Sequence, residues 1–159
     1  SVKASSQWFM ACGPQCAPGL ARLMGVRCVG AAADAGHQMH LLYLANDILF
    51  KGLAARPPGA SPAQDTVAAA FQPVLGPMLA AAFAKAGKTE EAHTKLGKML
   101  GFWRERAVYD EPVIANMEAG MTSIDNPAIA LATAVATAAA SAAAAAAAAA
   151  ASQQQQQQP

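Results

Sequence analysis

Two groups of side chains combine the spacing of a single helix face with the chemistry of a binding site. The first supplies a phenol, an amide, a carboxylate, a phenyl ring and an ammonium group, from Tyr43, Asn46, Asp47, Phe50 and Lys51. Steps of three and four residues place such side chains on one side of a helix, with Lys51 at the margin. The polar groups can hydrogen-bond an extended peptide, and the rings provide apolar contact. The alternative is a core tyrosine, a phenylalanine packed on a neighbour and a solvated Asn–Asp pair.

The second group is cationic and follows about fifty residues later. Its members share one predicted helix face, with Glu105 beside them: Lys95, Lys98, Phe102 and Arg106. The predicted buried face of the same helix contains Leu96, Met99, Leu100, Trp103 and Ala107. Lys98 and Arg106 are separated by roughly 12 Å at 1.5 Å per residue, a span suited to an extended phosphorylated peptide. The alternative is an ordinary solvated cationic face.

A zinc site is not indicated by the cysteines and histidines. Cys12, Cys16, His37 and His40 form C-x3-C followed by H-x2-H, but twenty residues separate the two pairs, which fits no zinc-finger spacing. Cys28 is expected to be a small core residue. The sequence therefore predicts no metal ligand.

No group of residues indicates catalysis. Asp34, Asp65 and Asp110 follow turns or loops, where helix capping explains them. The chain has no glycine-rich phosphate loop and no G-x-S-x-G elbow. We predict that the protein is not an enzyme, with no catalytic residue and no cofactor.

Charge and composition divide the chain into two parts. All 11 basic and 10 acidic residues lie at or before Asp125, and the net charge of +1 argues against a strongly basic nucleic-acid binder. The uncharged run from Ala128 to Ala151 is long enough to span a bilayer, but alanine gains far less from apolar transfer than leucine. We therefore expect a soluble tail and no membrane partner. Three cysteines fit a reducing compartment.

The elements that must position these groups are helices, since no segment alternates polar and apolar residues and no hairpin signal occurs. The predicted helices are Val2 to Ala11, about Pro18 to Gly30, a segment capped by Asp34 that ends near Gly52, Ser61 to Gly87, Thr89 to about Val108, and Asp110 to about Gly120. We expect an all-α domain over residues 1–124, followed by an Ala-rich and polyglutamine low-complexity tail over residues 125–159 in which helix would be marginal and exposed.

Three local details belong to this prediction. Trp8 and Phe9 make the first helix a short element with an aromatic anchor. Ser61 with Gln64 has the pattern of a capping box and marks a helix start. Pro73 and Pro77 are expected to kink or split the helix that follows.

Two motifs in order resemble one family. LLYLANDIL at residues 41–49 is similar to the family's LYLANDV helix, and LGKMLGFWRERAVY at residues 96–109 is similar to its LxxLLxxWxERxVY helix. The family is the CID, the domain that binds the C-terminal domain (CTD) of RNA polymerase II. The resemblance covers about residues 1–121.

The resemblance implies a fold and a set of contacts. The fold would be a right-handed superhelix of seven to eight helices, like VHS and ENTH domains, whose groove holds the heptad Tyr-Ser-Pro-Thr-Ser-Pro-Ser, usually phosphorylated. By similarity, Asn46 and Asp47 hydrogen-bond the tyrosine and the turn after it, and Tyr43 lines that pocket. Arg106 matches the arginine that meets a phosphoserine.

The chain departs from the family pattern at three places. Lys98 stands where some members carry arginine, which keeps the charge but loses the bidentate fork. Lys51 stands where several members have asparagine. The family's first helix should precede Ser1, so the resemblance implies a fragment whose apolar flank is exposed.

Ser5 to Phe9 and His40 to Tyr43 look most like the branch that contains calcium homeostasis endoplasmic reticulum protein and related splicing-linked factors.

The resulting hypothesis is a nuclear phosphopeptide-binding module that couples transcription to pre-mRNA splicing, with RNA or splicing factors as further partners. The alternative is a VHS/ENTH-type adaptor that binds lipid or cargo peptides at membranes. A third possibility is a structural domain without groove function. Nothing in the sequence specifies an oligomer.

Overall fold

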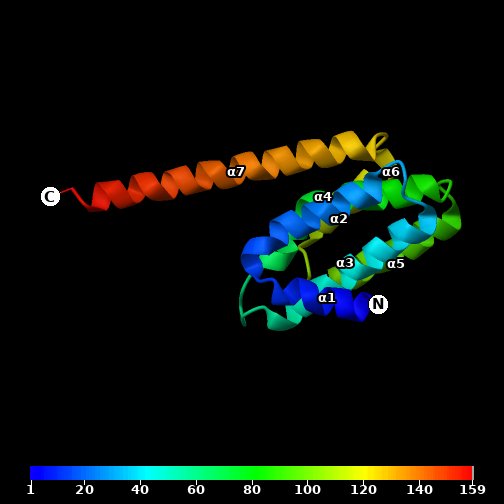
Figure 1. The fold of residues 1–159 in the computed structure, drawn as a ribbon, viewed down its shortest axis with the longest axis horizontal. Coiled ribbons are helices and arrows are strands. Elements are labelled where there is room, and N and C mark those ends of the chain that lie inside the picture. The colour runs from blue at the N-terminus through cyan, green and yellow to red at the C-terminus, as the bar shows by residue number, and fades with distance from the viewer. Residues whose placement is uncertain (159) are drawn as a thin grey trace.

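The computed structural model describes residues 1–158, which form seven α-helices and two single 3₁₀ turns, with no β-strand (Figure 1). In chain order the elements are α1 (Val2–Ala11), η1 (Pro14–Cys16), α2 (Ala17–Val29), α3 (Ala35–Ala55), η2 (Pro62–Gln64), α4 (Thr66–Lys85), α5 (Glu90–Glu105), α6 (Glu111–Ser123) and α7 (Pro127–Gln156). The predicted all-α class and number of helices are confirmed.

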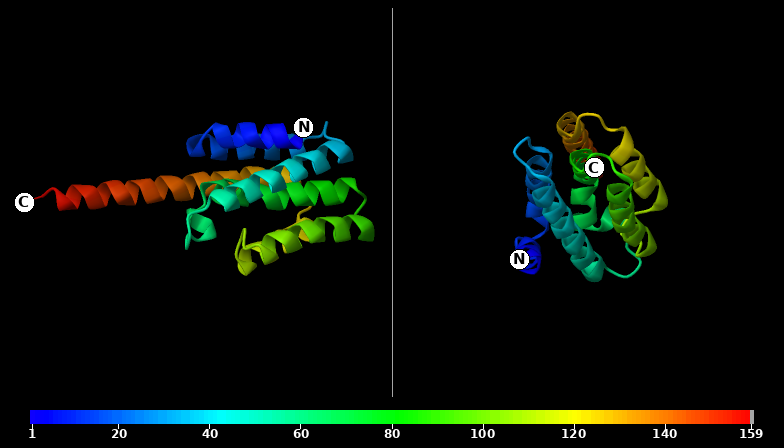
Figure 2. Two further views of the ribbon diagram at one scale, coloured as in Figure 1. Left: turned by 90° about the horizontal axis from the view of Figure 1, so that it is seen from below. Right: turned by 90° about the vertical axis from the view of Figure 1, so that its right-hand side faces the viewer.

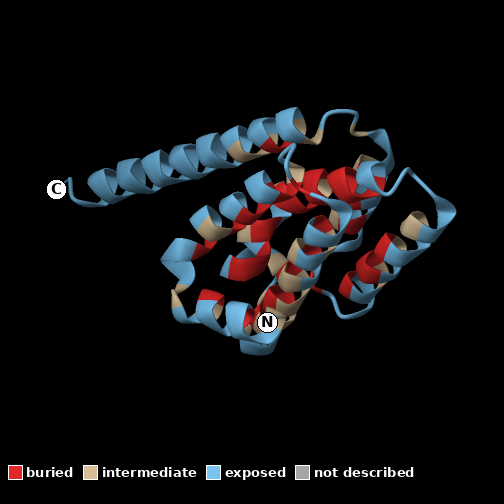
Figure 3. Cartoon of the chain, turned by 45° about the vertical axis from the view of Figure 1, so that its right-hand side comes forward, coloured by how far each residue is buried: buried red, intermediate tan, exposed pale blue. Residues whose placement is uncertain are grey.

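Helix α4 forms the centre of the bundle. It packs against α2, α3, α5, α6 and α7, and the end-on view in Figure 2 shows the other helices around it. Phe71, Leu75 and Leu79 are completely buried on it, as the red segments of Figure 3 illustrate. Pro73 and Pro77 do not split the helix. Each interior proline removes a backbone hydrogen bond, and burial of large apolar side chains on all sides offsets that loss.

Side chains cap most helices as expected, but Asp110, at the N-cap of α6, makes no side-chain capping hydrogen bond. Asp34 accepts a hydrogen bond from the His37 amide at 2.7 Å, and Thr89 caps α5. The prediction that Ser61 starts the long helix is wrong. Its capping box with Gln64 opens only the 3₁₀ turn η2, and α4 is capped instead by Asp65, whose Oδ1 accepts from two amides. The Asp65 side chain accepts from the Val67 and Ala68 amides and also pairs with Arg56, so it links the start of α4 to the end of α3.

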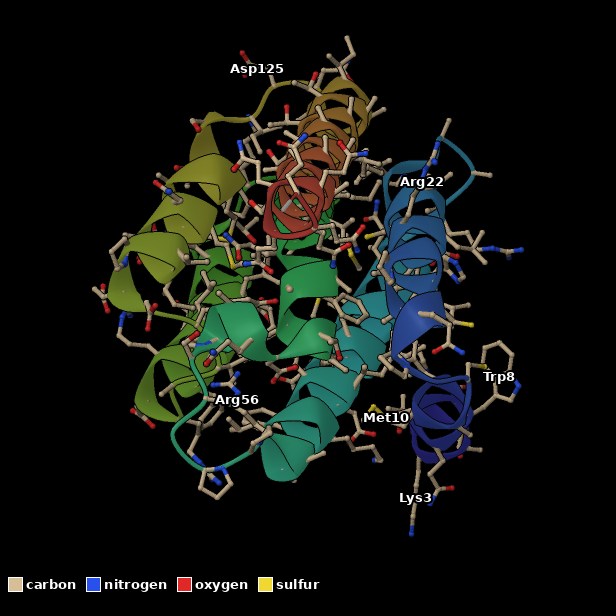
Figure 4. All side chains as sticks on the ribbon, turned by 90° about the vertical axis from the view of Figure 1, so that its left-hand side faces the viewer. Lys3, Trp8, Met10, Arg22, Arg56 and Asp125 are labelled. Carbon is tan, nitrogen blue, oxygen red and sulfur yellow. The ribbon has the colours of Figure 1, made fainter. Side chains whose placement is uncertain are left out.

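Helices α1 and α2 expose an apolar surface. Phe9 anchors α1 in the core, whereas Trp8 is 61% exposed and points away from the bundle (Figure 4). Trp8 is therefore no part of the predicted aromatic anchor. Leu23 and Val26 on α2 are also about half exposed. A cavity of about 570 Å³ lies between α1, α2 and α3 and is lined by Trp8, Leu23 and Leu44 among others.

Helix α7 contains the uncharged tail and extends away from the bundle (Figure 1). Asn126 caps it, and buried Leu131 docks its first turns against α2 and α4. A Cβ atom at Gly25 would lie 3.1 Å from Leu131 Cδ1, so glycine permits this close approach. By length and composition, α4 and α7 could each cross a membrane, but α4 is mostly buried inside the domain and α7 is almost entirely exposed.

Candidate functional site

Helix α3 presents one face to the core and another to solvent. Leu42, Ala45 and Leu49 are buried. At about 100° per residue, Tyr43 and Asp47 lie on the side opposite to these three residues. Tyr43 is 42% exposed, which excludes a place for this tyrosine in the core. The solvent face of α3 is therefore available for contact with a ligand.

Helix α1 borders this face and fixes the Asp47 carboxylate. Ser6 of α1 is completely buried, and its hydroxyl donates to Asp47 Oδ2. Lys51 Nζ donates to the same oxygen at 2.7 Å. The Lys51 hydrogen bond and then the Ser6 hydrogen bond hold the pKa of the Asp47 carboxyl below its ordinary value. Among residues 1–158 no donor reaches Asp47 Oδ1, so this oxygen can accept from a ligand.

Asn46 connects α3 with α5. The indole Nε1 of Trp103 donates to Asn46 Oδ1 at 2.8 Å. An indole nitrogen can only donate, so the amide atom that faces it must be the oxygen. The amide nitrogen of Asn46 then points elsewhere and makes no hydrogen bond among the described residues. Asn46 therefore offers two donors to a ligand.

Helix α5 separates its faces as predicted, with one exception. Leu96, Met99, Leu100 and Trp103 are buried, and Lys95, Lys98, Phe102 and Arg106 are exposed. Ala107, which was predicted to be buried, is exposed because α5 ends at Glu105 rather than near Val108.

A strained turn follows α5 and carries Arg106. Arg106 is the C-cap residue, and Ala107 adopts a left-handed φ of 53°. The Val108 amide donates to the Trp103 carbonyl at 2.9 Å, and the Ala107 amide donates to the Arg104 carbonyl at 3.2 Å. These two hydrogen bonds together make a Schellman motif. Glycine usually occupies the left-handed position, and alanine there gives no sequence signal for the end of the helix. This explains why the predicted helix was too long.

A buried arginine holds this turn from the other side. Arg56, at the end of α3, donates to the carbonyls of Ala107 and Val108 at 2.9 and 3.0 Å and to Asp65 at 3.0 Å. Tyr109 then donates from its phenol to the Ala68 carbonyl at 2.6 Å. Burial, followed by the charge of Asp65, raises the pKa of Tyr109 well above its ordinary value. The position of Arg106 thus depends on buried polar contacts behind it.

Helix α3 lies between α1 and α5 in both views of Figure 2, so these two helices border its exposed face. The face of α3 between its neighbours carries Tyr43, Asp47, Phe50 and Lys51. Asn46 turns toward α5, where Phe102 is 56% exposed. The cavity of about 570 Å³ includes none of these residues, because it lies on the other side of α1. We call the open face bounded by α1 and α5 the α3 groove.

The two predicted groups of side chains differ in whether their charged members form ion pairs. In the first, Asp47 is bound to Lys51, and Phe50 is half-buried against the core. In the second, Lys98 and Arg106 have no ion-pair partner among residues 1–158. Arg104, on the opposite side of α5, pairs with Glu111 and Glu118 of α6. The unpaired cations are therefore those on the groove side of α5.

Three residues behind the groove were not predicted to have a role in it. Ser6 gave no signal, because a serine within a helix is usually solvated. Arg56 precedes Pro57 and Pro58, and nothing in this part of the sequence marks a buried charge. Trp103 was predicted to be buried, and its indole N–H required an acceptor that the sequence did not identify.

The described part of the chain contains no group of three or more histidine, cysteine, aspartate or glutamate side chains that could hold a metal ion. Cys28 is buried, and burial raises the pKa of its thiol to about 12.

Comparison with known proteins gives one match. The family model described as CID domain matches residues 1–117, which extend from α1 into α6 and include every residue of the α3 groove. No curated protein and no solved structure matches the chain.

Proposed function

Because the chain belongs to the CID family, whose members are modules that bind the CTD of RNA polymerase II, we propose that its α3 groove recognises phosphorylated CTD heptads. The observation that supports this best is the hydrogen bond between Asn46 and Trp103. It joins the polar face of α3 to α5, the helix that carries Lys98 and ends at Arg106. A single extended peptide could contact both.

The α3 part of the groove suits the peptide itself. Asp47 Oδ1 can accept from a tyrosine hydroxyl or a main-chain amide, and the Asn46 amide can donate to a carbonyl. Tyr43 and Phe50 add aromatic surface on which proline and tyrosine side chains can pack. Lys51 neutralises one oxygen of Asp47 and so leaves a single acceptor for the peptide.

The α5 part suits phosphate. A phosphoserine carries close to two negative charges, and guanidinium binds phosphate oxygens in a bidentate manner. Arg106 is exposed and unpaired, so it is the principal candidate. Lys98 is also exposed and supplies a point charge that tolerates several phosphate positions.

The expected affinity is modest. A short disordered peptide loses conformational entropy on binding, and an open groove offers few contacts to offset it. A Kd on the order of micromolar to hundreds of micromolar is therefore expected. Binding of this strength would let the protein exchange among heptads as their phosphorylation changes. We place this activity in the nucleus, where it would connect transcription with pre-mRNA splicing, together with RNA or splicing factors.

Fluorescence anisotropy with the 159-residue chain tests the proposal. The probes are two-repeat CTD peptides, unphosphorylated or phosphorylated at heptad position two, five or seven. We expect saturable binding that prefers one phosphorylated peptide, and we expect Arg106→Ala to reduce that preference about tenfold, as loss of a charge-assisted hydrogen bond implies. Arg104→Ala is the matched control, since it removes an arginine from the opposite side of α5.

Two results would contradict the proposal. If Arg106→Ala kept the full phosphate preference, the phosphate site would be misplaced. If the folded chain bound none of the peptides, the groove would lack the proposed activity. Flotation with anionic vesicles at physiological salt then distinguishes the adaptor alternative, because only an adaptor should bind them.

A further inference from the structure

We infer that Trp103 is a positioning residue that fixes the hydrogen-bonding polarity of the α3 groove, so that a ligand must present an acceptor at Asn46 and a donor at Asp47. This inference rests on the proposed function, because it describes how the same groove selects the register of its peptide. It concerns a residue that is completely buried and does not touch the ligand.

The first step is the orientation of the Asn46 amide. An asparagine side chain can present its oxygen or its nitrogen to either side after a 180° rotation about its last bond. The Trp103 indole permits only one choice. Rotation would place the Asn46 N–H groups against the indole N–H, and the buried donor would lose its acceptor at 2.8 Å. Asn46 is therefore a donor toward the groove.

The second step is the complementary polarity one residue later. Asp47 Oδ2 is occupied by Ser6 and Lys51, which leaves Oδ1 as an acceptor. A carboxylate that is held ionised has no proton to donate. Adjacent positions of α3 thus present a donor and an acceptor. A peptide offers a carbonyl and an N–H or hydroxyl at this spacing only in certain registers and chain directions.

The third step connects this register with the phosphate site. The Trp103 carbonyl accepts from the Val108 amide and so closes the turn that carries Arg106. One residue therefore holds Asn46 through its side chain and the Arg106 turn through its backbone. The separation between Asn46, which sets the peptide register, and Arg106, which binds phosphate, is therefore fixed by the protein and not by the ligand. This is the geometry that discrimination between phosphorylated heptad positions requires.

A double-mutant cycle on peptide affinity tests the inference. The variants are Trp103→Phe, Asn46→Ala and the double variant, each titrated with the phosphopeptide that the unaltered chain prefers. Phenylalanine fills most of the space but removes the N–H. If Trp103 acts through Asn46, Trp103→Phe should weaken binding about three- to tenfold in the unaltered background and have almost no effect when Asn46 is already alanine.

Leu131→Ala is the control, because it also removes buried contacts, but where α7 docks against α2 and α4, away from the groove. It should lower stability and leave affinity unchanged. An equal loss of affinity for Trp103→Phe in both backgrounds would show that Trp103 acts only on the fold and would overturn the inference. Absence of binding by the unaltered chain would instead overturn the proposed function, and the inference with it.

A second measurement covers the case in which Trp103→Phe does not fold. Hydrogen exchange of the two indole N–H groups is followed by NMR in the unaltered chain and in Asn46→Ala. Trp103 should exchange far more slowly than exposed Trp8 and should lose protection in Asn46→Ala. Equal exchange of both indoles in the unaltered chain would show that the hydrogen bond does not exist and would overturn the inference.

Discussion

Replacement of Arg56 tests the most buried ion pair of the domain. Its side chain is 8% exposed and that of Asp65 is 4% exposed, at a distance of 3.0 Å. The guanidinium also donates to two carbonyls in the turn after α5. Arg56→Met leaves a buried carboxylate without its cation and should cost about 3–5 kcal/mol of unfolding free energy. Arg56→Lys keeps the charge but cannot reach all three acceptors, so it should cost about 2–3 kcal/mol.

The double variant separates the charge from the hydrogen bonds. In Arg56→Met with Asp65→Asn, no uncompensated charge remains, and the asparagine oxygen can still cap α4. This variant should be more stable than Arg56→Met alone, by about 1–3 kcal/mol. The assay is urea unfolding followed by far-ultraviolet circular dichroism, with the free energy taken from the midpoint and slope.

The control is Glu111→Gln, which removes an exposed partner of Arg104 and should leave the urea midpoint unchanged. Two results would refute the reasoning. If Arg56→Lys were as stable as the unaltered chain, the carbonyl contacts would contribute nothing. If the double variant were less stable than Arg56→Met, the buried charge on Asp65 would not be the source of the loss.

Three further perturbations follow from local geometry, and a fourth from electrostatics. Ala107→Gly should stabilise the chain by about 0.5–1 kcal/mol in urea unfolding, because glycine adopts the left-handed φ of 53° without strain; a loss of stability would contradict the strain. Leu131→Ala should cost about 2–4 kcal/mol, because this side chain docks α7; no change would show that α7 is not docked. Iodoacetamide at pH 8 should label exposed Cys16 in the folded chain and Cys28 only after unfolding, since burial raises the pKa of Cys28 to about 12; equal labelling by mass spectrometry would refute this. The pKa of the Asp47 carboxyl is lowered from its ordinary value of 3.8, so its stabilisation is present above pH 3.8 and is lost as pH falls through the folded pKa; Asp47→Asn should therefore flatten the acid limb of the stability curve below pH 3.8.

The sequence predicted helices and faces well because both depend on local periodicity. The exposed and buried sides of α5 were separated correctly from residues 96 to 106, and the helix starts at Asp34 and Thr89 were recognised from residue type. The errors lie where tertiary contacts override a local rule. Ala107 ends α5 without glycine because Arg56 and the packed Trp103 hold the turn, and neither contact is visible from spacing.

The candidate site was predicted in its exposed residues and missed in its supporting residues. Tyr43, Asn46 and Asp47 could be predicted because polar groups at helical spacing can be recognised from the sequence alone. The orientation of their side chains cannot be predicted in this way. Asp47 is oriented by Ser6, 41 positions before it, and Asn46 by Trp103, 57 positions after it. Only the fold brings these residues together, so the polarity of the groove could not be deduced from the motif alone.

The contacts that orient the groove involve the buried residues Ser6 and Trp103 and join different helices, whereas the groups that would meet a ligand are partly or fully exposed. Because a buried hydrogen bond loses more when its geometry is disturbed than a solvated one, the orientation of Asn46 is set by the bundle rather than by its own rotamer preference. The same holds for Arg106, whose turn is fixed from behind by Arg56. Helix α7 contributes none of these bonds. Changes in the exposed alanine and glutamine tract therefore have no direct path to the groove, while conservative changes inside α5 can alter recognition without touching the ligand.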